Sequence, residues 1–473
     1  MRTLCLFAMV SWLAGCGGGG GTGGGPDMAG GDMAGGTATP PSLISGDFVT
    51  FAGVTDSGWA ILTDADKTAW AIKVSDGTRH KLAEHTSWAT VLYDSALVEH
   101  DVGADGFGGL TAWFHDGPAS ELTAAAPDNA AGFSPPALDA AGHVAYWTRN
   151  SPTTALNDLV LDSLVQPSPH TVLIGIELSP TSGSCWPFLR YFAGRLLGTY
   201  CTAAPTRTLT SWDAATGLAV DLSTSSQLGF ATKANLGVLI TSTTGDLTLV
   251  AADGSGSPRA LGSDIAGAHI VDDGSALLTL TKTGGGLQRL PLAAGAAPIP
   301  LGGPAAHLGA VSLDGKWLQY TTMKDPTTFA TDLYLTSATS AQTPTTLVAA
   351  ATSFTLGWAF TDDSAFALYV DAYDANSFTG TLHALPTAGG AARTLGTAVY
   401  EDVAAGGSRV VFVDHYAGTY PDGRADVEFV DLAKSDAPTK LATQALSSFW
   451  TTLDGKTLYY VQPSEGLHIV ALP

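Results

Sequence analysis

Long apolar runs are missing from this 473-residue sequence. No stretch of eighteen or more apolar residues occurs, so we expect no membrane-spanning helix. Basic residues are also scarce, because 21 Lys and Arg stand against 43 Asp and Glu, which gives a formal net charge of −22. Such a charge repels phosphate groups and anionic lipid headgroups, so we expect no nucleic-acid partner.

Motifs that assemble catalytic or metal sites are absent too. The sequence has no nucleophile elbow of the form Gly-x-Ser-x-Gly, no His-Glu-x-x-His and no Cys-x-x-Cys, and its 11 histidines are scattered. Acidic loops at Asp371 to Asn376 and at Asp422 to Asp426 carry ligands that suit Ca²⁺, but they lack EF-hand spacing and fit solvated turns better. The sequence therefore favours a protein without catalytic residues, metal or cofactor.

The N-terminus reads as an export signal. Residues 1–15 combine the basic Arg2, an apolar run from Leu4 to Leu13, and two small residues. The run is about ten residues long, which is too short to span a bilayer. Leu13-Ala14-Gly15-Cys16 resembles the lipobox of bacterial lipoproteins. The resemblance implies a signal peptide over 1–15, lipidation of Cys16 and anchoring in the bacterial cell envelope. Because Gly17 replaces the aspartate that retains many such proteins at the inner membrane, it also implies the outer membrane.

A low-complexity segment follows the cysteine. Residues 16–42 are nearly all Gly, Thr, Ala, Asp, Met and Pro, and the five residues Asp27–Gly31 are repeated at Asp32–Gly36. Such a composition cannot bury a hydrophobic core. We expect a disordered Gly-rich linker that joins the lipidated Cys16 to the folded part at 43–473.

Two cysteines remain for the folded part once Cys5 and Cys16 are assigned. The segment between Cys185 and Cys201 reads as a hairpin with its turn at Ala193-Gly194. The two thiols are then expected nearly opposite each other on adjacent strands. In an exported protein this placement predicts a disulfide; the alternative is a pair of small buried thiols.

The folded part is predicted to be all-β with an internal repeat. Short β-branched and aromatic runs alternate with clusters of Gly, Asp, Ser, Pro and Thr, without a long helical period. A polar turn before an apolar strand recurs ten times between residues 57 and 455, at intervals of about 44 residues. Three further short strands fit into each period. This pattern predicts a β-propeller of four-stranded antiparallel blades, with about 8–10 repeats.

Two copies of the repeated turn are the clearest. Ser312-Leu-Asp314-Gly315-Lys316 and Thr452-Leu-Asp454-Gly455-Lys456 resemble the Ser-Pro-Asp-Gly-Lys core of TolB-like, or WD40-like PD40, propeller repeats, with leucine in place of proline. We interpret these Asp, Gly and Lys residues as structural turn residues. Ten repeats exceed the usual four to eight blades. Three arrangements therefore remain open: one wide ring, repeated turns that share a blade, and two smaller rings.

These observations favour a membrane-tethered, extracytoplasmic, monomeric propeller that binds a protein, peptide or glycan without catalysis. Trp88, Trp186, Trp358 and Trp450 form a possible sugar-stacking set. The alternative is an extracytoplasmic polysaccharide hydrolase or lyase with a site at the propeller funnel. A third interpretation, a TolB-like role in the cell envelope, follows only from the resemblance.

Overall fold

The protein is all-β, as the sequence predicts. The computed structural model describes residues 43–472, except for residues 129–135, 152–155, 179–187, 204–205, 225, 232–236, 243, 272–273, 294–295, 326–329, 352–358, 375–376, 378, 405, 418–422, 435–436 and 453. The described residues form forty strands and no helix. Among them, therefore, there is no helix that is long and apolar enough to cross a membrane.

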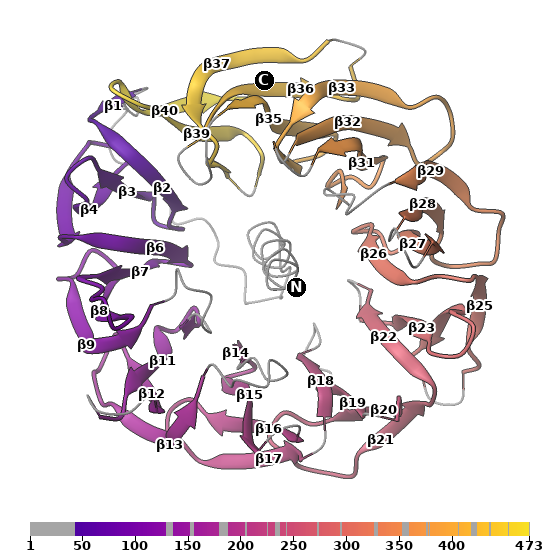
Figure 1. Ribbon diagram of the computed structural model, residues 1–473, viewed down its shortest axis with the longest axis horizontal. Coiled ribbons are helices and arrows are strands. Elements are labelled where there is room, and N and C mark those ends of the chain that lie inside the picture. The colour runs from indigo at the N-terminus through magenta and orange to yellow at the C-terminus, as the bar shows by residue number, and fades with distance from the viewer. Residues whose placement is uncertain are drawn as a thin grey trace, which may run out of the picture. The chain divides into compact units, whose positions relative to one another are not determined.

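The strands form ten four-stranded antiparallel sheets, the blades of a β-propeller fold (Figure 1). The chain divides into two compact units: an N-terminal unit of residues 36–262 and 464–466, and a C-terminal unit that includes residues 263–463 and 467–473. In nine sheets the four strands are consecutive and pair in chain order. Antiparallel neighbours joined by short turns account for this order.

Five sheets belong to the N-terminal unit. Their strands are β2 (Phe48–Val54), β3 (Trp59–Asp64), β4 (Ala69–Lys73) and β5 (Arg79–Ala83); β6 (Thr86–Leu92), β7 (Ser95–His100), β8 (Phe107–Phe114) and β9 (Ser120–Pro127); β10 (Ala137–Leu138), β11 (His143–Arg149), β12 (Leu156–Ser163) and β13 (His170–Glu177); β14 (Phe188–Phe192), β15 (Arg195–Ala203), β16 (Thr206–Asp213) and β17 (Ala219–Ser223); and β18 (Ser226–Ala231), β19 (Val238–Ser242), β20 (Leu247–Val250) and β21 (Arg259–Gly262).

Except for β1 and the first residue of β40, the strands of the remaining sheets belong to the C-terminal unit. They are β22 (Ile265–Ile270), β23 (Ala276–Thr281), β24 (Leu287–Pro291) and β25 (Ile299–Gly302); β26 (His307–Val311), β27 (Trp317–Asp325), β28 (Ala330–Ser337) and β29 (Thr345–Ala351); β30 (Ala359–Phe360), β31 (Phe366–Asp374), β32 (Thr379–Pro386) and β33 (Arg393–Val399); β34 (Glu401–Ala404), β35 (Arg409–Ala417), β36 (Arg424–Asp431) and β37 (Thr439–Leu446); and β38 (Phe449–Thr451), β39 (Thr457–Gln462) and β40 (Gly466–Ala471), in a sheet whose fourth strand is β1 (Leu43–Ser45).

Each of the ten repeated turns leads into the second strand of its own sheet, from β3 to β39. No two repeated turns therefore share a blade, because each lies in a different sheet. The second strands are buried on both faces: β3, β7 and β23 are each buried at their first five positions. The fourth strands β21 and β25 are mostly exposed. Burial on both faces explains why the second strands are nearly continuous apolar runs.

Apolar side chains fill the space between successive sheets. Within each unit, all four pairs of consecutive sheets enclose their own cluster of buried residues. Between the first two sheets, for example, Trp59 of β3 meets Trp113 of β8 edge to face, with ring centroids 5.3 Å apart. Stacking of neighbouring sheets therefore supplies the hydrophobic burial that a single blade lacks.

A close backbone approach fixes the start of β40 in the N-terminal unit. Gly466 has a φ of +130°, and a side chain there would place its Cβ 2.1 Å from the Ile44 carbonyl oxygen of β1. The neighbouring Gly46 amide donates a hydrogen bond to the Glu465 carbonyl. Only glycine fits this conformation and spacing.

Candidate functional site

The repeated Asp-Gly-Lys turns have a common hydrogen-bond pattern. Ser312 Oγ donates to Asp314 Oδ1 at 2.7 Å and accepts the Trp317 amide at 2.9 Å. Thr452 makes the same two contacts with Asp454 and Thr457, at 2.7 and 3.0 Å. Gly315 and Gly455 have φ values of +66° and +63°, a left-handed conformation that favours glycine. The Lys316 and Lys456 ammonium groups lie 3.0 and 3.4 Å from the aspartates two residues before them.

These turns also join neighbouring sheets of the C-terminal unit. The Asp314 amide donates to Ser364 Oγ in the next repeated turn at 3.1 Å. Arg409, at the start of β35, likewise donates to the carbonyl of Gly455 in the last repeated turn, at 3.3 Å. These contacts link the turn residues to one another and to the neighbouring sheets.

The predicted cysteine hairpin is present as β14 and β15. Phe192 pairs with Arg195, and the left-handed pair Ala193-Gly194 forms the two-residue turn. Cys185 lies outside the described residues, and of Cys201 only the backbone in β15 is described. The disulfide stays a prediction. Cys16 and its lipidation, the signal peptide and the linker also lie outside the described residues.

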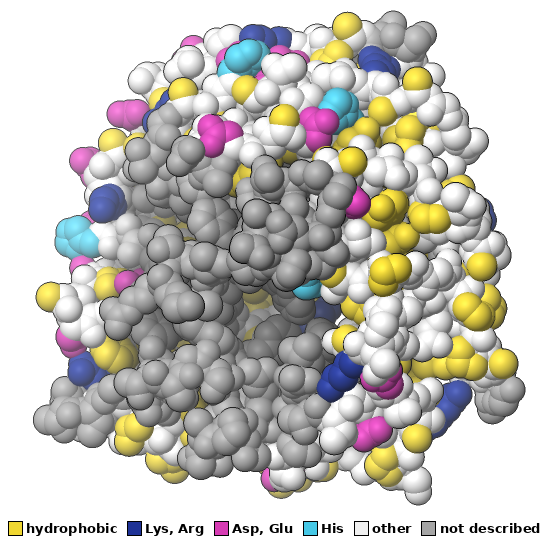
Figure 2. Space-filling view, turned by 45° about the vertical axis from the view of Figure 1, so that its right-hand side comes forward, with side chains coloured by type: hydrophobic (Ala, Val, Ile, Leu, Met, Phe, Trp, Pro, Cys, Tyr) yellow, Lys and Arg dark blue, Asp and Glu magenta, His cyan; other side chains and the backbone are white. Residues whose placement is uncertain are grey.

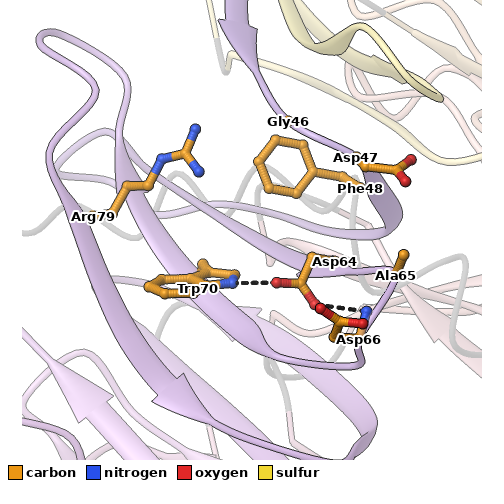
Figure 3. Close-up of a pocket in the computed structure, with 8 residues that line it drawn as sticks. All are labelled: Gly46, Asp47, Phe48, Asp64, Ala65, Asp66, Trp70 and Arg79. Carbon is orange, nitrogen blue, oxygen red and sulfur yellow. Dashed lines mark hydrogen bonds between the residues drawn. The ribbon is translucent and has the colours of Figure 1, made fainter.

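A pocket in the N-terminal unit brings aromatic and charged side chains together (Figure 3). Its volume is about 350 Å³. It lies beside the β3–β4 turn, the β1–β2 connection and the start of β5. The lining residues are Gly46, Asp47, Phe48, Asp64, Ala65, Asp66, Trp70 and Arg79.

A carboxylate fixes the indole of Trp70 in this pocket. Trp70 Nε1 donates to Asp64 Oδ2 at 2.8 Å, while Asp64 Oδ1 accepts the amides of Asp66 and Thr68 at 3.0 and 2.9 Å. Asp64 ends β3 and Trp70 lies in β4, so one tight turn brings the two together. The hydrogen bond holds the half-buried ring in one orientation at the pocket wall.

Arg79 and Phe48 form the opposite part of the wall (Figure 3). The Arg79 guanidinium lies over the buried Phe48 ring, 5.7 Å from its centroid, and donates to the Ser45 carbonyl at 2.5 Å. These contacts hold an exposed, planar cation with several N–H donors at the rim. Asp47 and Asp66 are also exposed, so the pocket presents donors and acceptors around an aromatic surface.

Trp70 and Arg79 belong to none of the motifs identified in the sequence. No local motif marks the pocket, because Phe48, Trp70 and Arg79 come from three different strands. Of the four tryptophans in the proposed sugar-stacking set, Trp186 and Trp358 lie outside the described residues, and Trp88 and Trp450 are half-buried in first strands of sheets in different units. The tryptophan that lines the pocket is Trp70, which lies outside that set.

Neither a protein-family model nor a curated protein matches the sequence. Similar solved structures include the tricorn protease, with a TM-score of 0.35 and 9% identity over 90% of this chain and 52% of that chain. A eukaryotic initiation factor gives a TM-score of 0.49 and 11% identity over 76% and 90%. A protein described as TolB from Agrobacterium tumefaciens gives 0.27 and 18% over 50% and 86%. This chain thus spans about half the length of the tricorn protease, and at such low identity no activity carries over.

Proposed function

We propose that this protein is a lipid-anchored, extracytoplasmic β-propeller that binds a glycan in the Trp70 pocket without catalysing a reaction. The observation that carries the proposal is the fixed Trp70 indole, facing a pocket whose rim holds the Arg79 guanidinium and the carboxylates of Asp47 and Asp66. Pockets of this kind, with an aromatic wall and a few polar groups, are the usual form of small-ligand sites.

The chemistry of the lining favours a saccharide over the other ligand classes. A sugar ring has an apolar C–H face that packs on an indole, and hydroxyl groups that both donate and accept hydrogen bonds. Carboxylates accept such bonds and a guanidinium donates them, so the two together suit pairs of hydroxyls. A strongly cationic peptide would meet Arg79 at the rim, and an anionic one would meet the aspartates.

The pocket is less suited to hydrolysis of a polysaccharide. Most glycoside hydrolases need two carboxyl groups on either side of the scissile bond, one of them able to donate a proton. The Asp64 carboxylate already accepts three hydrogen bonds, from two amides and the Trp70 indole. It therefore serves to position the ring and is poorly suited to act as the proton donor.

A glycan array tests this proposal, followed by calorimetric titration with the best-bound oligosaccharide. We expect Trp70→Ala to abolish binding and Arg79→Ala to weaken it by about tenfold, the cost of about one hydrogen bond to a charged group. Arg259→Ala is the matched control, because Arg259 is also exposed at the first position of a fourth strand, β21. The proposal fails if no glycan binds, if Trp70→Ala binds as well as the wild type, or if a bound oligosaccharide is cleaved.

The proposed anchor rests on the sequence Leu13-Ala14-Gly15-Cys16. More than one acyl chain on a single cysteine would hold the protein stably at a bilayer. Metabolic labelling with a palmitate analogue provides the test. We expect the wild type to incorporate the label and Cys16→Ser to lose it, with Cys5→Ser as the matched control. Undiminished labelling of Cys16→Ser would exclude acylation at this residue.

A further inference from the structure

A second cluster of polar side chains lies in the C-terminal unit. Asp414 and His415 of β35 and Glu428 of β36 each bring one ligand-type atom to within 4.8 Å of the others. Asp414 is buried, Glu428 is half-buried and His415 is exposed. The cluster therefore has one deep oxygen and one nitrogen that solvent reaches.

The strand pairing explains how neighbouring residues come to share one site. Side chains at consecutive positions of a strand normally point to opposite faces. The register of β35 and β36 shifts between Asp414 and Ala417, and His415 has a φ of +55°. This irregularity brings His415 Nδ1 to 3.5 Å from Asp414 Oδ2 and 3.7 Å from Asp426 Oδ2.

Negative charge in the cluster exceeds the positive charge that faces it. Asp414 and Asp426 pair directly across the two strands, and like charges at such positions are destabilising. Lys440 lies opposite Glu428 in the register, but its ammonium group binds Asp426, at 2.6 Å.

The two oxygens of the buried Asp414 carboxylate have different surroundings. The side chain is only 6% exposed. Its Oδ1 accepts the amides of Ala398 and His415, at 2.9 and 2.8 Å. Within the part of the chain that the structure describes, Oδ2 accepts no such bond and faces His415 Nδ1 at a separation too long for a good one. Oδ2 is therefore the Asp414 oxygen that faces His415 in the cluster.

A histidine beside an aspartate is not by itself unusual in this protein. Figure 2 shows histidine side chains lying next to acidic side chains at the surface. His85, for example, lies 2.7 Å from Asp101. The Asp414 cluster differs because a third ligand, Glu428, joins the pair, and among the described residues this is the one such group of three.

We propose that Asp414, His415 and Glu428 bind a divalent transition-metal ion, for which zinc is the probe. One imidazole nitrogen and two carboxylate oxygens are ligands that zinc takes at about 2.0–2.2 Å. The exposed His415 side chain, at 61% exposure, has room to close on the ion. Three protein ligands leave a position open to water or to a ligand oxygen. The sequence predicts no metal site here, because the three proposed ligands come from two strands and form no local motif.

Calorimetric titration of the full chain with zinc chloride tests this site. We expect one saturable site in the wild type, and at least a tenfold loss of affinity in both His415→Ala and Glu428→Gln. His85→Ala is the matched control, since it removes an exposed, aspartate-paired histidine outside the cluster and should bind zinc as the wild type does.

Circular dichroism of the metal-free proteins confirms that the variants are folded, and Glu428→Gln preserves the size of the side chain should His415→Ala fail to fold. The proposal is overturned if the wild type shows no saturable zinc binding, as it would if Lys440 were a sufficient counter-charge. It is equally overturned if Glu428→Gln binds as tightly as the wild type, or if the affinity is lost in His85→Ala instead. None of these outcomes depends on a glycan, so the Trp70 pocket is tested separately.

Discussion

Replacing Ser312 by alanine tests whether the hydroxyl–carboxylate turn stabilises its sheet. Ser312 is only 1% exposed. The substitution removes the hydrogen bond to Asp314 Oδ1 and leaves the Trp317 amide, at the start of β27, without its hydroxyl acceptor. Leaving a buried donor unsatisfied costs about 1–3 kcal/mol, and because this amide is only partly buried we expect about 1–2 kcal/mol.

Hydrogen exchange at the Trp317 amide is the most direct assay. A loss of 1–2 kcal/mol corresponds to roughly 5–30-fold faster exchange if the turn opens locally. Urea unfolding followed by tryptophan fluorescence gives the global effect, although a chain of ten sheets need not unfold in one step. Ser312→Thr is the matched control, because Thr361 makes the same pair of contacts in the next turn, at 2.7 and 3.1 Å.

The reasoning is refuted if Ser312→Ala exchanges at the wild-type rate and keeps the wild-type urea midpoint. It is also refuted if Ser312→Thr is destabilised as much as Ser312→Ala. In that case packing around the side chain would matter more than its hydroxyl group.

Two further predictions concern stability. Phe412 is fully buried between the sheet of β30–β33 and the sheet of β34–β37. We expect Phe412→Ala to lower the free energy of unfolding by about 3–5 kcal/mol, measured by urea unfolding, and Phe412→Leu to lower it less. Hydrogen bonds from Thr452 and Lys456 lower the pKa of Asp454 below its unfolded value of about 3.9. Its stabilising contribution is therefore present above about pH 4 and is lost as the pH falls through the folded pKa. Asp454→Asn should lower the urea midpoint more at neutral pH than near pH 2; an equal effect at both would contradict this.

The repeat and the blade were predictable because turn chemistry and strand burial are local properties. Trp317 and Thr457 begin second strands directly after their Asp-Gly-Lys turns, as the sequence indicates. The number of sheets was not fixed by the same signal. A short first strand such as β10, with two residues, or β30, also with two, leaves almost no pattern in the sequence. Only the pairing of these strands shows that each repeated turn belongs to a separate four-stranded sheet.

Neither candidate site was predictable, because both depend on register and on side-chain direction. Asp414 and Glu428 lie on two consecutive strands, and their approach depends on a register shift after Asp414 that no local residue pattern marks. In the pocket, Trp70 pairs with Lys81 across β4 and β5, whereas Arg79 pairs with Ile72, so the two pocket residues are not cross-strand partners. They share the pocket only because Phe48 and the Asp64 turn complete its wall. In a propeller scaffold, residues that recur in each repeat build the sheets, whereas residues that occur in one blade alone give that blade its chemistry.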